Sequence, residues 1–192
     1  MVDFTETDFH LETERLTIRN WREEDRDLFY LINSDDKVME FFPFRRDKAA
    51  SDKMMDDMRS DIMKDGFGYT ALEIKETGES IGFCGLHYCK AEPIIPRESI
   101  EIGWRLAPQF WGKGYITEAS FRLLEFGFND LNLNEIISFA VKGNQNSFAV
   151  MERIGMHRDE VMDFDHPLVP DTHPHLKPHL FYSIENPNKK GG

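Results

Sequence analysis

The sequence predicts an α+β fold in which about four helices flank one mixed, mostly antiparallel β-sheet of about seven strands. Two observations lead to this prediction. Between residues 67 and 106, short segments with strand-like hydrophobicity, separated by turn residues, indicate antiparallel strands. The second half changes to a strand, an amphipathic helix and another strand, which indicates one parallel pair within the same sheet.

The size and composition of the chain suit a single domain. It has 192 residues, of which 40% are hydrophobic and 30% charged, enough for a full core without disulfides or metals. We expect one domain over residues 1–186 and a loose C-terminal tail over residues 187–192. The acidic opening residues do not resemble a secretory signal and no long apolar stretch follows, so we expect a cytoplasmic protein.

The formal net charge is −12, from 35 acidic and 23 basic residues. Nucleic acids and anionic membranes dock where Lys and Arg are in surplus, so this charge argues against both as partners and weakly favours a cationic substrate. The two cysteines, Cys84 and Cys89, have an odd spacing that puts them on opposite faces if both lie on one strand. We therefore expect free, buried thiols.

The first third of the chain shows strand, helix, loop and helix patterns in that order. Residues 15–21 alternate like a half-exposed strand. A helix follows from about residue 23 and ends at the Asn-Ser-Asp-Asp run at 33–36. After an aromatic loop at 41–44, apolar residues at every fourth position predict a second helix: Ala50, Met54, Met58 and Ile62.

The remaining elements follow from alternation, turn residues and helical periodicity. A turn around Gly78 indicates a hairpin of two strands, and a third antiparallel strand follows it. The expected strands are 67–75, 80–89, 99–106, 135–141, 157–164 and 180–185, and the expected helices are 114–129 and 145–154. A loop rich in Pro and His, residues 165–179, lies between the last two strands.

The segment 106–115 ends a predicted strand, contains Gly112 and Gly114 and opens an amphipathic helix. Glycines let the backbone approach a ligand, and the free amides at a helix start favour a pyrophosphate, although a simple tight turn has the same spacing. Two other nucleotide patterns do not fit. A dinucleotide fingerprint needs a third glycine where Thr117 stands, and an NTPase phosphate loop needs Ser or Thr directly after Lys113.

The pattern Gln109-x-x-Gly112-x-Gly114 resembles the Gln/Arg-x-x-Gly-x-Gly/Ala signature of the GNAT superfamily of N-acetyltransferases. Three further segments resemble its ribosomal-protein N-terminal acetyltransferase branch. In chain order they are Thr-Glu-Arg-Leu-Thr-Ile-Arg at 13–19, Glu-Ile-Gly-Trp at 101–104 and Asn-Gln-Asn-Ser-Phe-Ala-Val-Met-Glu-Arg-Ile-Gly-Met at 144–156. The resemblance extends over residues 13–185, nearly the whole chain.

The resemblance implies a GNAT-like sheet whose two parallel central strands splay apart around acetyl-CoA. It implies that the protein passes the acetyl group to a primary amine by direct attack in a ternary complex, without a metal. The acceptor would be a protein N-terminus or a small amine. The residues that the resemblance places at the cofactor are Trp104, Arg105, Leu106, Gln109, Phe110, Trp111, Gly112, Lys113, Gly114, Tyr115, Asn144 and Ser147.

Glu101 is the candidate general base. A lysine-like amine has a pKa of about 10.4, so it is mostly protonated at neutral pH and must lose a proton before it attacks a thioester. On a strand, Glu101 shares one face with Gly103 and Arg105. The alternative is an exposed strand glutamate that pairs with Arg97 or Arg105.

Ser147 is the first candidate for the proton donor to the leaving thiolate, ahead of Tyr182 and Tyr115. Asn144 and Ser147 also have the spacing of a helix N-cap and the third residue of its helix, which is compatible with a role in catalysis. Some relatives carry a glutamate on the strand that here reads Phe-Ala-Val at 139–141. Its absence motivates an alternative function, a non-catalytic acyl-CoA-binding sensor or interaction module.

Two loops, residues 41–44 and 165–179, are expected to shape the acceptor pocket, where Asp35, Asp36 and Glu40 would attract a cation. The second loop contains His166, His173, His175 and His179. Their spacing does not match the paired ligands of a zinc site, so no metal is predicted. Monomer and homodimer both remain open.

Overall fold

The structure, a computed structural model, describes residues 9–189. Within them, nine strands form one sheet in the order β1-β2-β3-β4-β5-β6-β9-β7, and β8 pairs with β9. The neighbouring strands are antiparallel except for β5 and β6, which are parallel. The predicted α+β class with a mixed, mostly antiparallel sheet is confirmed.

The element bounds follow the chain. The strands are β1 His10–Glu12, β2 Leu16–Arg19, β3 Tyr69–Ile74, β4 Ser80–Tyr88, β5 Ile100–Leu106, β6 Glu135–Val141, β7 His157–Arg158, β8 Phe164–Asp165 and β9 Pro178–Glu185. The α-helices are α1 Arg26–Ser34, α2 Lys48–Asp65, α3 Tyr115–Asn129 and α4 Gln145–Arg153. Short 3-10 helices lie at η1 Glu23–Asp25, η2 Pro108–Phe110, η3 Glu160–Met162, η4 Pro174–Leu176 and η5 Pro187–Lys189.

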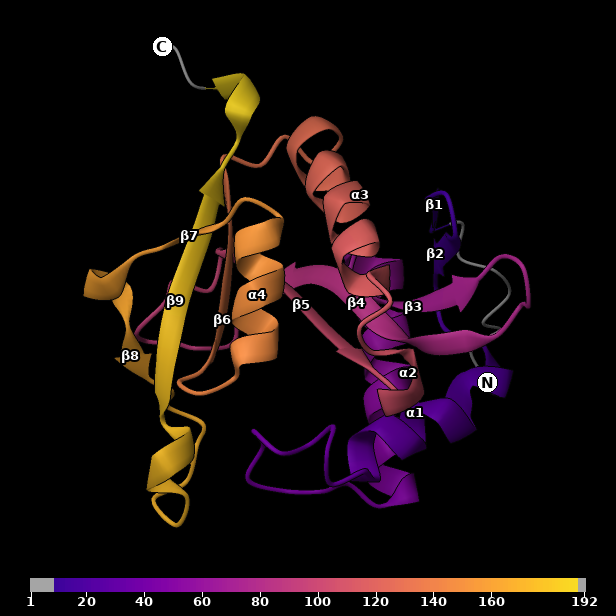
Figure 1. Ribbon diagram of the computed structural model, residues 1–192, viewed down its shortest axis with the longest axis horizontal. Helices are drawn as coiled ribbons and strands as arrows, with labels where there is room; N and C mark the ends of the chain where they lie inside the picture. The colour runs from indigo at the N-terminus through magenta and orange to yellow at the C-terminus, as the bar shows by residue number, and fades with distance from the viewer. Residues whose placement is uncertain (1–8, 190–192) are drawn as a thin grey trace.

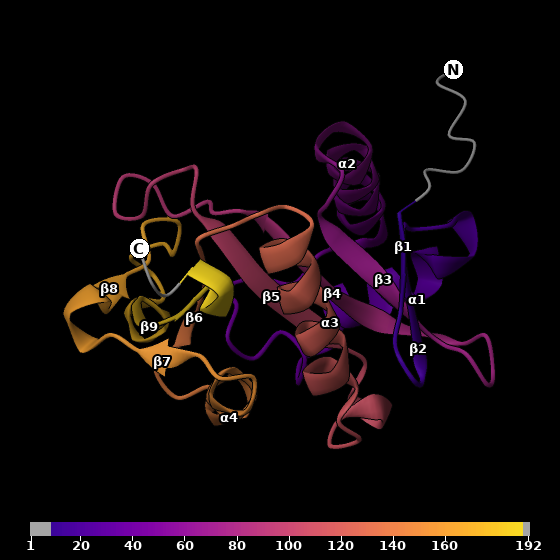
Figure 2. The ribbon, with the colours of Figure 1, turned by 90° about the horizontal axis from the view of Figure 1, so that it is seen from above.

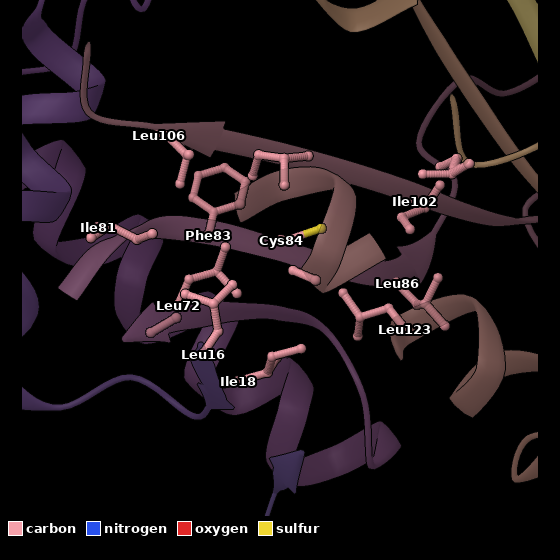
Figure 3. Packing of buried hydrophobic residues seen from close by; sticks show 14 of the residues in the cluster. Leu16, Ile18, Leu72, Ile81, Phe83, Cys84, Leu86, Ile102, Leu106 and Leu123 are labelled. Carbon is pink, nitrogen blue, oxygen red and sulfur yellow. The ribbon is translucent and has the colours of Figure 1, made fainter. Parts of the chain in front are cut away.

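Helices cover both faces of the sheet, with α1 and α2 on one face and α3 and α4 on the other (Figures 1 and 2). Two successive residues of β4 show why. The ring of Phe83 lies 6.2 Å from that of Phe29 on α1, whereas Cys84 contacts Ser120 on α3. Successive strand side chains point to opposite faces, so β4 contributes to the core on both sides. Figure 3 shows this packing around Phe83, Cys84 and Leu86.

Helix α2 has a defined cap at each end. The side chain of Asp47 accepts a hydrogen bond from the backbone of Ala50 at 2.8 Å, and Gly66 ends the helix in the left-handed region with φ of 77°. Its buried stripe is Ser51, Met55, Met58 and Ile62. The predicted stripe was wrong by one position in the first turns, because Ala50 is exposed and Met54 is only partly buried.

Two of the predicted strands differ from the structure, and one residue of the first differs in its burial. The first strand is short, and an additional strand, β1, pairs with it at the sheet edge. The predicted strand at 157–164 is divided into β7 and β8, because Asp159 accepts a hydrogen bond from Val161 and a 3-10 turn forms. Arg19 is buried rather than on an exposed face, since it pairs with Asp25.

The predicted loose tail is partly anchored. Pro187–Lys189 form a 3-10 helix, and the ammonium of Lys189 donates to the carbonyl of Asn132 and the side chain of Asn134, both at 2.7 Å. Residues 190–192 lie outside the described residues, as do the acidic residues 1–8. Within residues 9–189, no helix is both long and apolar enough to cross a bilayer.

Candidate active site

The two parallel strands are joined at one end and separate toward the other. Their ladder contains a single registered pair, Glu101 with Ile137, and the hydroxyl of Ser138 donates to the carbonyl of Ile102 at 2.9 Å. Beyond this point β5 and β6 diverge, and the two parts of the sheet separate on either side of α3 and α4 (Figure 1). A cavity of about 1020 Å³ opens at this splay, lined by residues from β5, β6, α3 and α4.

The loop that follows β5 reaches α3 through two glycines in the left-handed region, Gly112 with φ of 72° and Gly114 with φ of 79°. A Cβ atom built on Gly112 would meet nothing within 4 Å. The first amides of α3 have no side-chain cap, and the amides of a helix's first turn lack partners within the helix. The loop therefore presents open space and free backbone donors beside the cavity, which fits an anionic group.

Side chains hold this loop in place on both flanks. The indole Nε1 of Trp111 donates to the carbonyl of Leu106 at 2.9 Å, which ties the loop back to the end of β5. Arg15 donates to the carbonyl of Lys113 at 3.0 Å and to Glu118 at 2.6 Å. Because Arg15 pairs with Glu118, the carboxylate in the first turn of α3 is neutralised before any anion binds.

Glu101 lies on the wall of the cavity and is 9% exposed. Its cross-strand partner on β4 is His87, so the two side chains share one face, and His87 Nε2 lies 3.3 Å from Glu101 Oε2. The same nitrogen contacts the hydroxyl of Tyr69. The predicted alternative of an exposed glutamate paired with Arg97 or Arg105 is wrong, because the partner is a histidine and the site is buried.

Tyr69 closes the face of β5 beside Glu101. A Cβ atom on Gly103 would lie 2.6 Å from the Tyr69 hydroxyl, so only glycine leaves room for the phenol here. Burial first, and the charge of Glu101 second, raise the pKa of Tyr69 well above its ordinary value. The phenol therefore stays protonated and is a fixed hydroxyl next to His87.

The start of α4 forms the opposite wall. Asn144 caps the helix, and its side chain accepts from the backbone of Ser147 at 3.2 Å. Both residues line the cavity, and the cap uses the backbone amide of Ser147 rather than its hydroxyl. Tyr182 lies elsewhere: its ring stacks on Phe148 at 5.7 Å and its hydroxyl faces Glu152 of α4 at 3.4 Å. Tyr182 is therefore not among the residues that line the cavity, because the phenol packs against α4.

Most of the predicted site residues line the cavity together. These are Glu101, Trp104, Arg105, Leu106, Phe110, Trp111, Gly112, Gly114, Tyr115, Asn144 and Ser147. Gln109 and Lys113 are exposed and are not in the wall, and the ammonium of Lys113 lies 5.3 Å from the Phe110 ring centroid. His87, Tyr69 and Ser138 also line the cavity, and no sequence motif predicted them. Only the register between β4 and β5 places His87, and no short turn fixes that register in the sequence.

The loop at residues 35–46 forms one rim of the cavity, and two of its aspartates are bonded within the loop itself. Asp35 accepts hydrogen bonds from the backbone of Lys37 and Val38, and Asp36 pairs with Arg45 at 2.9 Å. Neither aspartate lines the cavity, whereas Glu40 of the same loop does, so of the three acidic residues only Glu40 keeps its predicted place and its role toward a cationic acceptor stays a prediction.

The histidine-containing loop contributes His166 and His179 to the wall, with ring centroids 4.9 Å apart. Burial, and then the charge of His179, lower the pKa of His166 to about 4. Burial also lowers the pKa of His179. Both imidazoles are thus neutral at pH 7 and form an aromatic wall with Phe139 and Phe164. Among residues 9–189 no group of three or more His, Cys, Asp or Glu side chains is arranged to hold a metal ion.

The cavity, the splay and the glycine loop coincide with a known domain. The acetyltransferase (GNAT) domain matches residues 15–157. The chain belongs to the GNAT acetyltransferase family. An uncharacterised N-acetyltransferase of Bacillus licheniformis, p20, is 31% identical to this GNAT chain over 159 residues, which cover 79% of the chain and 84% of the relative.

Solved structures agree on the fold. A GNAT-family acetyltransferase from Bacillus anthracis matches with a TM-score of 0.76 at 23% identity and covers 93% of this chain and 99% of that one. A ribosomal-protein-S5-alanine acetyltransferase from Vibrio fischeri matches with a TM-score of 0.72 at 16% identity, covering 96% and 100%. The predicted acetyl-CoA-dependent N-acetyltransferase of the GNAT family is confirmed.

Proposed function

We propose that the protein transfers the acetyl group of acetyl-CoA to a primary amine by direct attack, with both substrates bound in the cavity between β5 and β6. The observation that carries this proposal is the splay, which pairs the strands only at Glu101 and Ile137 and opens toward the glycine loop. A long, narrow ligand with an anionic end fits such a space. The proposed domain comprises residues 1–186 and the proposed location is the cytoplasm.

The proposed cofactor site follows the wall of the cavity. Backbone groups of Trp104 and Arg105 on β5 would hold the pantetheine arm, and the amides around Gly112 and Gly114 would hold the pyrophosphate. The carbonyl of Leu106 already accepts from Trp111 and is therefore engaged within the protein. Acetyl-CoA supplies the acetyl group as a thioester, and the residues of the chain position it and move the protons.

The proposed roles separate the two proton transfers. Glu101, beside His87, accepts the proton of the ammonium, so that the neutral nitrogen attacks the thioester carbonyl carbon. The carbon–nitrogen bond forms and the carbon–sulfur bond breaks. The hydroxyl of Ser147, on the opposite wall, donates the proton that the leaving thiolate takes up, and it is reprotonated by the second proton that the nitrogen loses as the amide forms. The acetylated amine and free coenzyme A then leave the cavity.

Gly112→Asp is the test of the cofactor site. The substitution puts a side chain and a negative charge into the open space of the loop. Acetyl-CoA affinity should fall at least about a hundredfold, because the carboxylate repels the pyrophosphate at the helix start and the side chain occupies its space. Isothermal titration calorimetry measures this change. The new Cβ has room, because nothing lies within 4 Å of it, but a non-glycine residue at φ of 72° strains the backbone, so the control must carry the same strain.

Gly78→Asp is the matched control. Gly78 has φ of 70°, against 72° for Gly112, and its Cβ position is also free of contacts within 4 Å. It lies in the turn between β3 and β4, so the same backbone strain and charge are introduced away from the cavity. Equal acetyl-CoA affinities for the two folded variants would refute the assignment. Binding without turnover of any amine would favour the non-catalytic alternative.

A further inference from the structure

Arg105 lines the cavity and has no acidic partner among the described residues. One of its nitrogens, Nη1, donates to the side-chain oxygen of Asn33 at 2.6 Å. Its guanidinium lies between two aromatic rings, 4.4 Å from the centroid of Phe42 and 5.3 Å from that of Phe83. Among the ion pairs within residues 9–189, none involves Arg105.

A second cation, Arg46, lies near Arg105 and is also without a carboxylate in the described part of the chain. It stacks on Phe44 at 4.5 Å, and its Nη1 is buried and has no hydrogen-bond partner there. Burial lowers the pKa of Arg46. Burial first, and the charge of Arg46 second, lower the pKa of Arg105 to about 10. Two neighbouring positive charges therefore lack a local counter-ion.

Arg46 and Arg105 are partly buried, and their surroundings contrast with those of two buried arginines in the same chain. Arg19 pairs with Asp25 at 2.8 Å and with Glu73 at 2.8 Å, and Arg59 pairs with Glu23 at 2.5 Å. The chain has 35 acidic residues against 23 basic ones, so carboxylates are in surplus. A buried charge without a partner is costly to the fold, and a ligand that supplies the missing charge removes that cost.

We propose that the acceptor is a primary amine that also carries an anionic group, a carboxylate or a phosphate, and that Arg105 binds this group while the amine lies at Glu101. This inference rests on the proposed acetyl transfer and adds the chemical class of the acceptor. The planar guanidinium suits either anion, because both present two oxygens to its fork of donors. Arg46 contributes a second positive charge behind Arg105.

The geometry of β5 sets the length of such an acceptor. Glu101 and Arg105 lie four residues apart on the same face of one strand, so their Cα atoms are about 13 Å apart. Between them lies Gly103, which has no side chain, and the hydroxyl of Tyr69 faces this gap. The side chains of Glu101 and Arg105 take up part of this distance. The spacer between the amine and the anion of the acceptor spans the remainder.

A series of linear amines tests this class. Acetylation rates are measured for ω-amino carboxylates with two to six methylene groups, for their uncharged primary amides of equal length, and for ω-aminoalkyl phosphates. For the wild-type protein, kcat/KM for the best carboxylate or phosphate should exceed that of its matched amide at least about tenfold, the size expected for a charged hydrogen-bonded contact. The two anionic arms distinguish carboxylate from phosphate.

Variants test whether Arg105 carries the preference. Arg105→Gln should bring the ratio of anionic to amide acceptors to about one, and Arg105→Lys should retain part of it because the charge remains without the fork. Arg122→Gln is the control, since Arg122 pairs with Glu125 on α3 and is outside the cavity wall. The ratio in Arg122→Gln should equal that of the wild type.

The outcomes separate this inference from the proposed function. If the wild type acetylates amides as well as the matched anions, the anionic acceptor is refuted and acetyl transfer stands. If no amine is acetylated although acetyl-CoA binds, the proposed function itself fails. The wild-type series decides the first question even if Arg105→Gln does not fold. Circular dichroism and acetyl-CoA binding report whether each variant is folded.

Discussion

At the scale of single residues, burial decides which side chains in the cavity are charged. His166 has its ring in contact with Phe139, Phe164 and His179, and its Nδ1 accepts a hydrogen bond from the backbone of Leu168 at 3.2 Å. Protonation would remove that acceptor and place a charge among aromatic rings. The neutral imidazole is therefore part of the folded wall, and its titration is coupled to stability.

His166 predicts a loss of stability in mild acid. Its pKa is about 4 in the folded protein, below the ordinary value of 6.5, so between these values the unfolded chain binds more protons. Stability from this group is complete above about pH 6.5 and is lost as the pH falls toward 4. Allowing for solvent screening of a half-buried group, the loss is on the order of 1–2 kcal/mol. Urea unfolding at pH 7, 6, 5 and 4 measures it.

His166→Asn should flatten this pH dependence, because the amide retains an acceptor and does not titrate. His175→Asn removes an exposed imidazole of the same loop and is the control. An unchanged slope in His166→Asn would show that other groups cause the acid sensitivity.

At the scale of elements, the pairing of β4 with β5 creates the proposed base. The register puts His87 opposite Glu101, and neither strand by itself contains both groups. The sequence indicated Glu101 because it lies on the strand that borders the predicted splay. The position of His87 beside it is set by a cross-strand register, and the long connection at residues 89–99 does not fix that register. Tyr182 shows the opposite case, because the position in the chain suggested a donor and the packing of α4 covers it.

Glu101→Gln tests this pair. The amide keeps the size of the side chain but cannot accept the ammonium proton, so kcat should fall by about 10²–10⁴, the usual contribution of a general base. The acetyl-CoA dissociation constant should remain unchanged, since the proposed cofactor contacts are backbone groups of β5 and of the glycine loop and do not include the Glu101 side chain. Steady-state kinetics with an active amine, together with calorimetry, separate the two effects.

Glu98→Gln serves as the control for Glu101→Gln, because Glu98 is exposed in the connection before β5. A kcat for Glu101→Gln within about twofold of the wild type at pH 7 would exclude Glu101 as the base.

At the scale of the whole molecule, a buried ion pair joins the sheet to the segment that leads into α1. Arg19 on β2 is 4% exposed and Asp25 at η1 is 1% exposed, and two hydrogen bonds of 2.8 and 3.0 Å connect them. Asp25 also accepts from Ser80 on β4 at 2.6 Å and from the backbone of Arg22 at 2.8 Å. Strands β2 and β4 and the start of α1 are therefore linked through one carboxylate.

Asp25→Asn should lower the free energy of unfolding by about 3–5 kcal/mol. It removes the negative charge that pairs with the buried guanidinium of Arg19, and it points the new amide NH2 at groups that are themselves donors. Asp27→Asn, at an exposed ion pair with Lys48, should leave the free energy of unfolding nearly unchanged. Chemical denaturation of both variants makes the comparison. Equal losses would mean that the buried pair does not stabilise the fold.

The sequence by itself determined the α+β class, the parallel pair, the glycine loop and the family, because these depend on hydrophobic period, turn residues and short motifs that are local in the chain. The tertiary structure decided which polar groups meet. His87 reaches Glu101 through strand register, Asp35 and Asp36 are used within their own loop, and Arg46 and Arg105 come together from segments far apart in the chain. Contacts of this kind depend on register and packing between distant segments, and no local pattern encodes them.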